Sequence, residues 1–111
     1  MSLSVHKTET FVVDVASQFT WYLVEAGEPT AWRFIEAVDA TLNLLGRHPE
    51  QGRRRHFSHP ALNGIRSFRV AAPFDSFLIF YRPTADTLQA WRLMHGARDL
   101  PRRLTESLRP K

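Results

Sequence analysis

The sequence of 111 residues contains no cysteine, only two lysines and no long apolar run. Without cysteine the chain can form neither disulfides nor thiolate metal sites, and a reducing cytoplasm is the compartment we expect for it. No segment approaches the roughly 18 apolar residues that a membrane-spanning helix requires, and the N-terminus lacks the apolar core of a secretion signal. We therefore expect neither a membrane partner nor export.

Signatures of cofactor binding and of catalysis are also missing. The sequence has no glycine-rich phosphate loop and no nucleophile and base at a recognisable spacing. His56 and His59 are spaced as two metal ligands are, but no third ligand lies close to them. We therefore expect no metal and no cofactor. No internal repeat or low-complexity tract divides the chain, so residues 1–111 are expected to form a single domain.

Positive charge is segregated to the second part of the chain. Residues 1–46 carry two basic and six acidic side chains, a balance of −4. Residues 47–111 carry thirteen basic and five acidic side chains, a balance of +8. A codon preference for arginine would explain why arginine outnumbers lysine, but not why the charge is segregated. The basic part is therefore predicted to meet an anionic partner.

The apolar pattern of the first half predicts a short strand followed by two helices. The strand is expected over residues 3–7. Apolar side chains then recur at spacings of three and four in two stretches, which is typical of amphipathic helices. Thr8 or Thr10 can cap the first helix, and the second is expected to stop at Gly46. Because the connection is short, the helices should form an antiparallel hairpin.

The second half predicts three strands, over residues 65–70, 76–81 and 88–95. The middle segment is apolar at nearly every position, which is typical of a central strand covered on both faces. An irregular basic segment precedes these strands, and a short helix is expected after Asp99. The predicted fold is therefore α+β, in the order β-α-α-β-β-β. The helical hairpin packs on one face of a small, mainly antiparallel sheet, and the other face is open.

Four segments carry a family resemblance: the second predicted helix with its turn, the opening of the next strand, the middle strand, and the last strand with its turn. They are Leu44–Arg53, Ile65–Arg66, Phe80–Arg82 and Leu93–Leu100. With the order of elements, they resemble the RelE/ParE superfamily of toxins from bacterial toxin–antitoxin (plasmid stabilization) modules, over nearly the whole chain. The resemblance implies a cognate antitoxin, whose C-terminal segment wraps the toxin and holds it inactive.

The superfamily has two functional branches. RelE-like toxins cut mRNA on the ribosome with cationic side chains and usually a C-terminal tyrosine, whereas ParE-like toxins bind and inhibit DNA gyrase. Here Leu104 stands about where that tyrosine would fall, and the basic loop has arginines, which are poor proton shuttles. We therefore interpret the chain as a ParE-like toxin that acts by binding and not as an enzyme. The alternatives are a RelE-like, metal-independent mRNA endonuclease and a degenerate member that only binds antitoxin.

Two sets of candidate site residues follow. Under the nuclease alternative, the resemblance selects Arg66 and Arg98 as stabilising cations, and His95 could supply acid–base chemistry. A local packing role explains His95 as well. The residues predicted to bind a partner or an anion are Arg53, Arg54, Arg55, Arg66, Arg82, Arg98 and Trp32. An exposed Trp32 would mark a surface for the antitoxin or for a second copy of the chain, so a homodimer is also possible.

Overall fold

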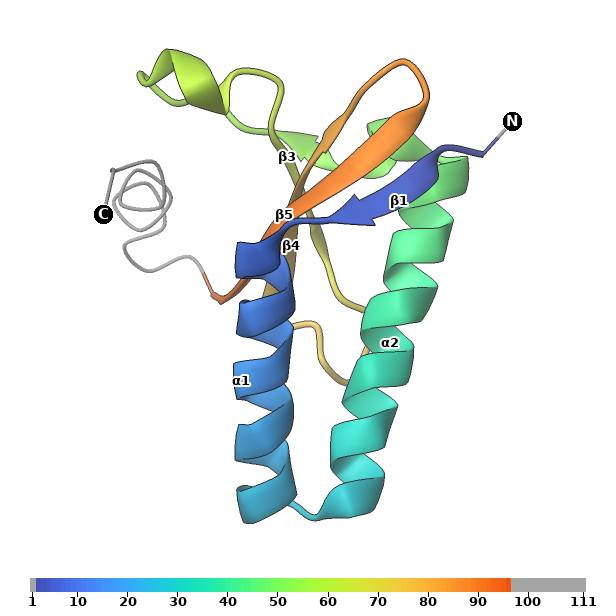
Figure 1. The fold of residues 1–111 in the computed structure, drawn as a ribbon, viewed down its shortest axis with the longest axis vertical. Helices are drawn as coiled ribbons and strands as arrows, with labels where there is room; N and C mark the ends of the chain where they lie inside the picture. The colour runs from blue at the N-terminus through green and yellow to red at the C-terminus, as the bar shows by residue number, and fades with distance from the viewer. Residues whose placement is uncertain (1, 97–111) are drawn as a thin grey trace.

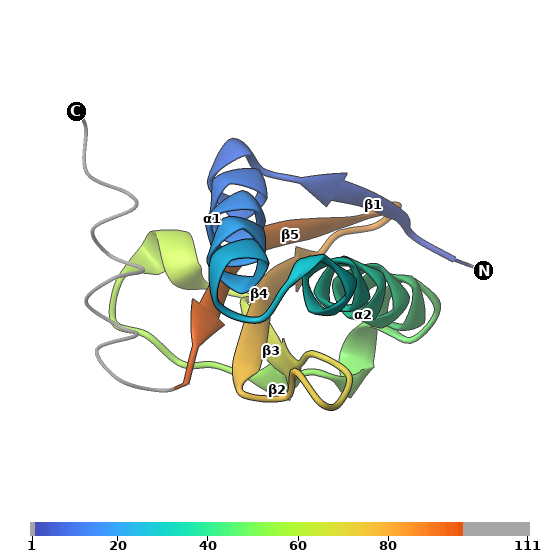
Figure 2. The same cartoon turned by 90° about the horizontal axis from the view of Figure 1, so that it is seen from below.

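The computed structural model describes residues 2–96, which form two helices packed on one face of a five-stranded sheet (Figure 1). The helices are α1 (Glu9–Glu25) and α2 (Glu28–Arg47), and Figure 2 views them close to end-on, side by side over the strands. This arrangement confirms the predicted α+β fold. The predictions for Arg98 and for a helix after Asp99 lie outside the described residues. Within residues 2–96, no helix has the length and apolarity needed to cross a membrane.

The sheet has the strand order β1-β5-β4-β3-β2. The strands are β1 (Ser4–Lys7), β2 (Arg53–Arg54), β3 (Arg66–Arg69), β4 (Phe77–Pro83) and β5 (Thr87–His95). Only the pair β1–β5 is parallel among the described strands, so the sheet is mainly antiparallel, as predicted. Residues 77–81 of the central strand are all buried, which confirms that β4 is covered on both faces.

One strand was not predicted. The start of the basic segment, expected to be irregular, pairs with β3 as the outer strand β2, in which Arg53 lies opposite Ser67 and Arg54 lies opposite Arg66. A strand of two arginines has neither the alternation nor the β-branched side chains by which strands are found in a sequence.

The two helices begin where their sequences indicate, but α2 ends later than expected. The Thr8 hydroxyl accepts a hydrogen bond from the amide of Phe11 at 3.1 Å and caps α1. The predicted stop at Gly46 is wrong, because α2 continues through this buried glycine. The Leu3 amide donates to the Gly46 carbonyl at 2.8 Å, and a Cβ at residue 46 would lie 3.2 Å from the Leu3 oxygen. This glycine therefore admits the chain entering β1.

Apolar side chains are buried on both faces of the sheet. The main core lies between helices and sheet and includes Phe11, Phe34, Val38, Leu42, Leu45, Ile79, Tyr81 and Leu88. A smaller cluster of Leu62, Ile65, Leu78, Phe80 and Met94 is buried on the other face. The prediction of an open second face is therefore wrong where the segment with the 3-10 helix η2 (Pro60–Leu62) covers β4.

Candidate binding groove and basic surface

An apolar groove of about 320 Å³ lies between α1 and α2, and we call it the hairpin groove. Its walls are formed by Phe11, Val12, Val15, Ala16, Phe19, Trp32, Ile35 and Val38, with Lys7 and Asp39 also lining it. Lys7 Nζ and a carboxylate oxygen of Asp39 form an ion pair of 3.5 Å at the end remote from the helical connection. The groove is therefore apolar along its length and charged at one end.

Several apolar side chains of the hairpin groove are in contact with solvent. Trp32 is 52% exposed and Val12 is 50% exposed. The Trp32 ring meets Phe19 edge to face, with 4.9 Å between the ring centroids, so the indole is held in place while half of its surface is bare. Contiguous exposed apolar surface of this kind is typical of binding sites. The structure thus gives Trp32 the exposure that its predicted partner role requires.

The three arginines at the start of the basic segment differ in their surroundings. Arg53 and Arg54 are exposed, and within residues 2–96 no hydrogen bond or ion pair engages their side chains. Arg55 is half-buried: its Nε donates to the Ser67 hydroxyl at 2.7 Å, and its guanidinium carbon lies 5.7 Å from the centre of the Phe80 ring. Burial lowers the pKa of Arg55, and the positive charge of Arg53 lowers it further.

Arg66 and Tyr81 together hold the turn that leads into β2. The Tyr81 hydroxyl donates to the Pro49 carbonyl at 2.7 Å and accepts from the Gly52 amide at 2.8 Å. Arg66 Nη1 donates to the carbonyls of Gly52 and Glu50, at 2.8 and 3.1 Å. Burial raises the pKa of Tyr81, while the Gly52 amide and the charge of Arg66 act in the opposite direction. Sequence reasoning missed this role of Tyr81, because its partners are backbone groups.

Arg82 is also engaged with backbone. Its Nε donates to the Asn63 carbonyl at 3.0 Å, and its Nη2 donates to the carbonyl of Ala61. These bonds hold the segment that covers the second face of the sheet. The predicted contact of Arg66 and Arg82 with a partner stays a prediction, and the structure shows that both guanidinium groups already support loops.

Arg66 and His95, the two candidate catalytic residues within the described range, do not lie together. Arg66 of β3 pairs with Tyr81 of β4, and His95 of β5 pairs with Phe77 of β4. The two residues are therefore in the two strands that flank β4. The four-residue offset along β4 corresponds to roughly 13 Å. His95 is exposed, and its ring packs edge to face on Phe77 at a centroid distance of 5.1 Å. Arg98 lies outside the described residues. Within the described range, no three histidine or acidic side chains cluster as metal ligands would.

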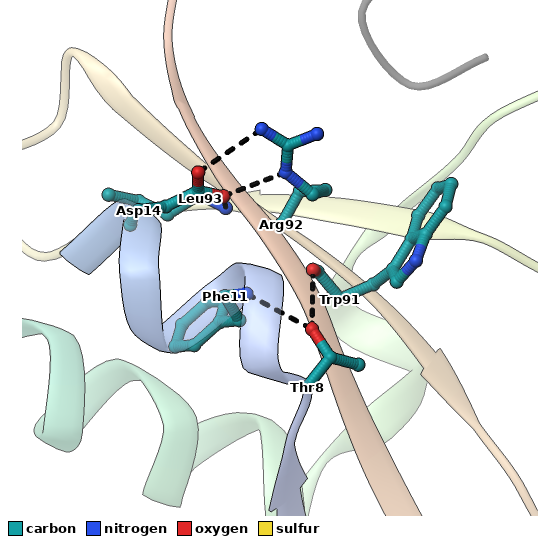
Figure 3. A network of polar contacts seen from close by, with 6 residues as sticks. All are labelled: Thr8, Phe11, Asp14, Trp91, Arg92 and Leu93. Carbon is teal, nitrogen blue, oxygen red and sulfur yellow. Dashed lines mark hydrogen bonds and ion pairs between the residues drawn. The ribbon is translucent and has the colours of Figure 1, made fainter. Parts of the chain in front are cut away.

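A polar network holds α1 against β5 at the point where β1 has ended (Figure 3). The Asp14 carboxylate accepts from Arg92 Nε at 2.8 Å and from the Leu93 amide at 3.0 Å. The Thr8 hydroxyl donates to the Trp91 carbonyl at 2.9 Å. This network fixes the helix that forms one wall of the hairpin groove. The only signal in the sequence is an aspartate between valines, which gives no indication of its partner.

The comparisons with known proteins agree with this architecture. A family model described as the ParE toxin of the type II toxin–antitoxin system parDE matches residues 5–100. The chain therefore belongs to the ParE toxin family of type II toxin–antitoxin systems, which confirms the resemblance seen in the sequence and implies an antitoxin as a partner.

A solved structure and the curated proteins complete the comparison. A chain of the chromosomal ParDE toxin–antitoxin system from P. aeruginosa is similar with a TM-score of 0.69 and 19% sequence identity. The match covers 86% of this chain and 98% of that chain, and at this identity it concerns the fold alone. Curated proteins give no match.

Proposed function

We propose that this protein is a cytoplasmic toxin that acts by binding DNA gyrase, and that its cognate antitoxin neutralises it by occupying the hairpin groove. The groove is the observation that supports the proposal most directly. A soluble helical hairpin normally turns polar side chains to water, whereas this one exposes Val12 and Trp32 along a continuous apolar depression.

The shape and chemistry of the hairpin groove favour a peptide segment as its occupant. An apolar channel between two helices accepts the apolar face of an amphipathic segment, whose side chains insert at regular spacing. Tryptophan is enriched among the residues that dominate such interfaces, so Trp32 is the expected anchor. Lys7 and Asp39 at one end can set the direction of the segment. A second copy of the chain bound in the same groove would compete with the antitoxin.

The positions of the candidate catalytic residues favour binding over catalysis. General acid–base chemistry on an RNA phosphate requires the acid or base and the stabilising cation to reach the same few atoms. Arg66 and His95 lie on opposite sides of β4 and are offset along it, and Arg66 Nη1 is committed to two carbonyls. These observations support a toxin that binds its target, in preference to the RelE-like endonuclease.

The experiment that tests the proposal is gyrase supercoiling in vitro with the purified chain, alone and with its antitoxin. We expect inhibition by the toxin and recovery of supercoiling when the antitoxin is added. No inhibition at micromolar toxin, together with cleavage of ribosome-bound mRNA, would replace the proposal with the endonuclease alternative. Antitoxin binding without either activity would identify the chain as a non-toxic member.

A further inference from the structure

The edge of the sheet formed by β2 and its neighbour β3 places arginines next to one another. Arg54 lies directly opposite Arg66 in the antiparallel pair β2–β3, and Arg53 is close enough to Arg55 to lower its pKa. Like charges directly opposite each other destabilise an antiparallel pair. Such an arrangement is favourable when an anion binds between the cations, because each guanidinium then gains charge-assisted hydrogen bonds.

This edge strand carries its charge on both faces of the sheet. Arg53 is opposite Ser67 and therefore lies on the face of the second apolar cluster, whereas Arg54 is opposite Arg66 on the helix side. Arg55 lies on the same face as Arg53, that of the second apolar cluster, where it contacts Ser67 and Phe80. We call these three consecutive arginines the basic edge.

The surface beside the basic edge is concave, and its lining is basic and not acidic. Two hollows of about 460 and 420 Å³ adjoin there and share Arg54, Arg55, His56 and Phe57. None of the described residues that line the two hollows is acidic. An anion that enters the hollows is therefore lined by guanidinium groups and by no carboxylate.

We infer that the basic edge binds the sugar–phosphate backbone of duplex DNA, so that the toxin contacts the DNA on which its target acts. The choice of DNA rests on the proposed gyrase function. Duplex DNA presents one negative charge per roughly 1.7 Å of its axis, so a duplex lying along this edge can place phosphates beside both exposed arginines, Arg53 and Arg54. A protein interface would need an apolar core, but the apolar side chains of these hollows, which are Phe57, Leu62, Ile65 and Pro83, are half-buried or buried.

The position of the basic edge leaves the hairpin groove free for its own partner. The basic edge begins on β2, whereas the groove is lined by Lys7 of β1, and these two strands are at opposite edges of the sheet. DNA bound at one edge therefore does not occupy the groove, and the two contacts can be measured separately.

The test is fluorescence anisotropy of a short labelled DNA duplex, titrated with the toxin without gyrase, between about 50 and about 200 mM salt. Arg53→Gln and Arg54→Gln remove exposed charges that support no loop. Each is expected to reduce the slope of log K against log salt by about 1 and to weaken binding roughly three- to tenfold. The matched control is Arg33→Gln on α2, which removes the same charge from an exposed position and should leave DNA binding unchanged.

Each outcome of the test has a distinct meaning. If gyrase is inhibited but the toxin does not bind duplex DNA, or if Arg33→Gln weakens DNA binding as much as Arg54→Gln, the inference is wrong and the proposed function stands. Tighter binding to single-stranded RNA than to duplex DNA also overturns it. Loss of binding to gyrase without DNA in Arg53→Gln and Arg54→Gln would assign the basic edge to an acidic protein surface instead. DNA binding without gyrase inhibition would leave the assignment of the basic edge to duplex DNA standing and refute the proposed target.

Discussion

The phenol of Tyr81 and the backbone of Gly52 are fitted against each other. The Gly52 amide donates to the Tyr81 hydroxyl at 2.8 Å, and a Cβ at residue 52 would lie 2.2 Å from the same oxygen. No side chain fits there without displacing the ring. Because Gly52 immediately precedes β2, this contact determines where the basic edge begins. A buried residue of the central strand thus positions exposed charge at the margin of the sheet.

Removal of this hydroxyl is expected to destabilise the fold. Tyr81→Phe deprives the Gly52 amide and the Pro49 carbonyl of a hydrogen-bond partner while leaving the ring in the core. A buried polar group that loses its partner costs about 1–3 kcal/mol, and we expect the free energy of unfolding to fall by that amount in urea titrations. Tyr22→Phe is the control, because no hydrogen bond of the Tyr22 hydroxyl is found among residues 2–96. Equal losses in the two variants would contradict the role given to Tyr81.

The same phenol predicts a loss of stability at alkaline pH. Burial raises the pKa of Tyr81, so the unfolded chain releases the phenolic proton at a lower pH than the folded chain does. The contribution of the phenol is therefore fully present below pH about 10, the ordinary tyrosine value, and is lost as the pH rises through the folded pKa. We expect the urea midpoint of the wild-type protein to fall more steeply over this range than that of Tyr81→Phe. Parallel curves for the two proteins would refute the prediction.

The hydrogen bonds of Asp14 to β5 are expected to contribute more to the free energy of unfolding than the ion pair of Lys7 and Asp39 at the end of the hairpin groove. The side chains of Asp14 and Arg92 are 15% and 17% exposed, whereas those of Asp39 and Lys7 are 55% and 44% exposed. Asp14→Ala also removes the acceptor of the Leu93 amide. We expect it to lower the free energy of unfolding by about 2–4 kcal/mol. Asp39→Ala should cost less than about 1 kcal/mol. Similar losses in the two variants, measured by urea unfolding, would contradict this ranking.

The parts of the fold that sequence predicts are those with a strong local pattern. The helices follow from the spacing of their apolar side chains, and β4 follows from its continuous apolar run. The parts that were missed depend on contacts between distant segments. Arg53 and Arg54 form a strand only because β3 pairs with them, and the glycine at residue 46 lies inside α2 where Leu3 passes too close for a side chain to fit easily. Neither relationship leaves a mark in the neighbouring sequence.

The candidate site was predictable in composition but not in geometry. The charge segregation pointed to the arginines, and the isolated tryptophan on the second helix pointed to a partner surface. The guanidinium groups of Arg66 and Arg82 donate to backbone carbonyls in loops. These hydrogen bonds could not be predicted from the positions of the two arginines in strands. The link between Asp14 and Arg92 joins residues separated by 78 positions in the chain, which no local spacing reveals.

The hairpin groove gives the most direct prediction about antitoxin recognition. Trp32→Ala is expected to weaken antitoxin binding at least about 30-fold, because truncation of a central aromatic anchor costs about 2 kcal/mol or more. Trp21→Ala is the matched control: Trp21 is 53% exposed against 52% for Trp32, is on α1 and does not line the groove. Both variants should unfold at a similar urea concentration, and calorimetric titration with the antitoxin should separate them. If Trp21→Ala weakened binding as strongly as Trp32→Ala, the antitoxin would have to cover the outer face of α1, and the groove would not be the site that neutralises the toxin.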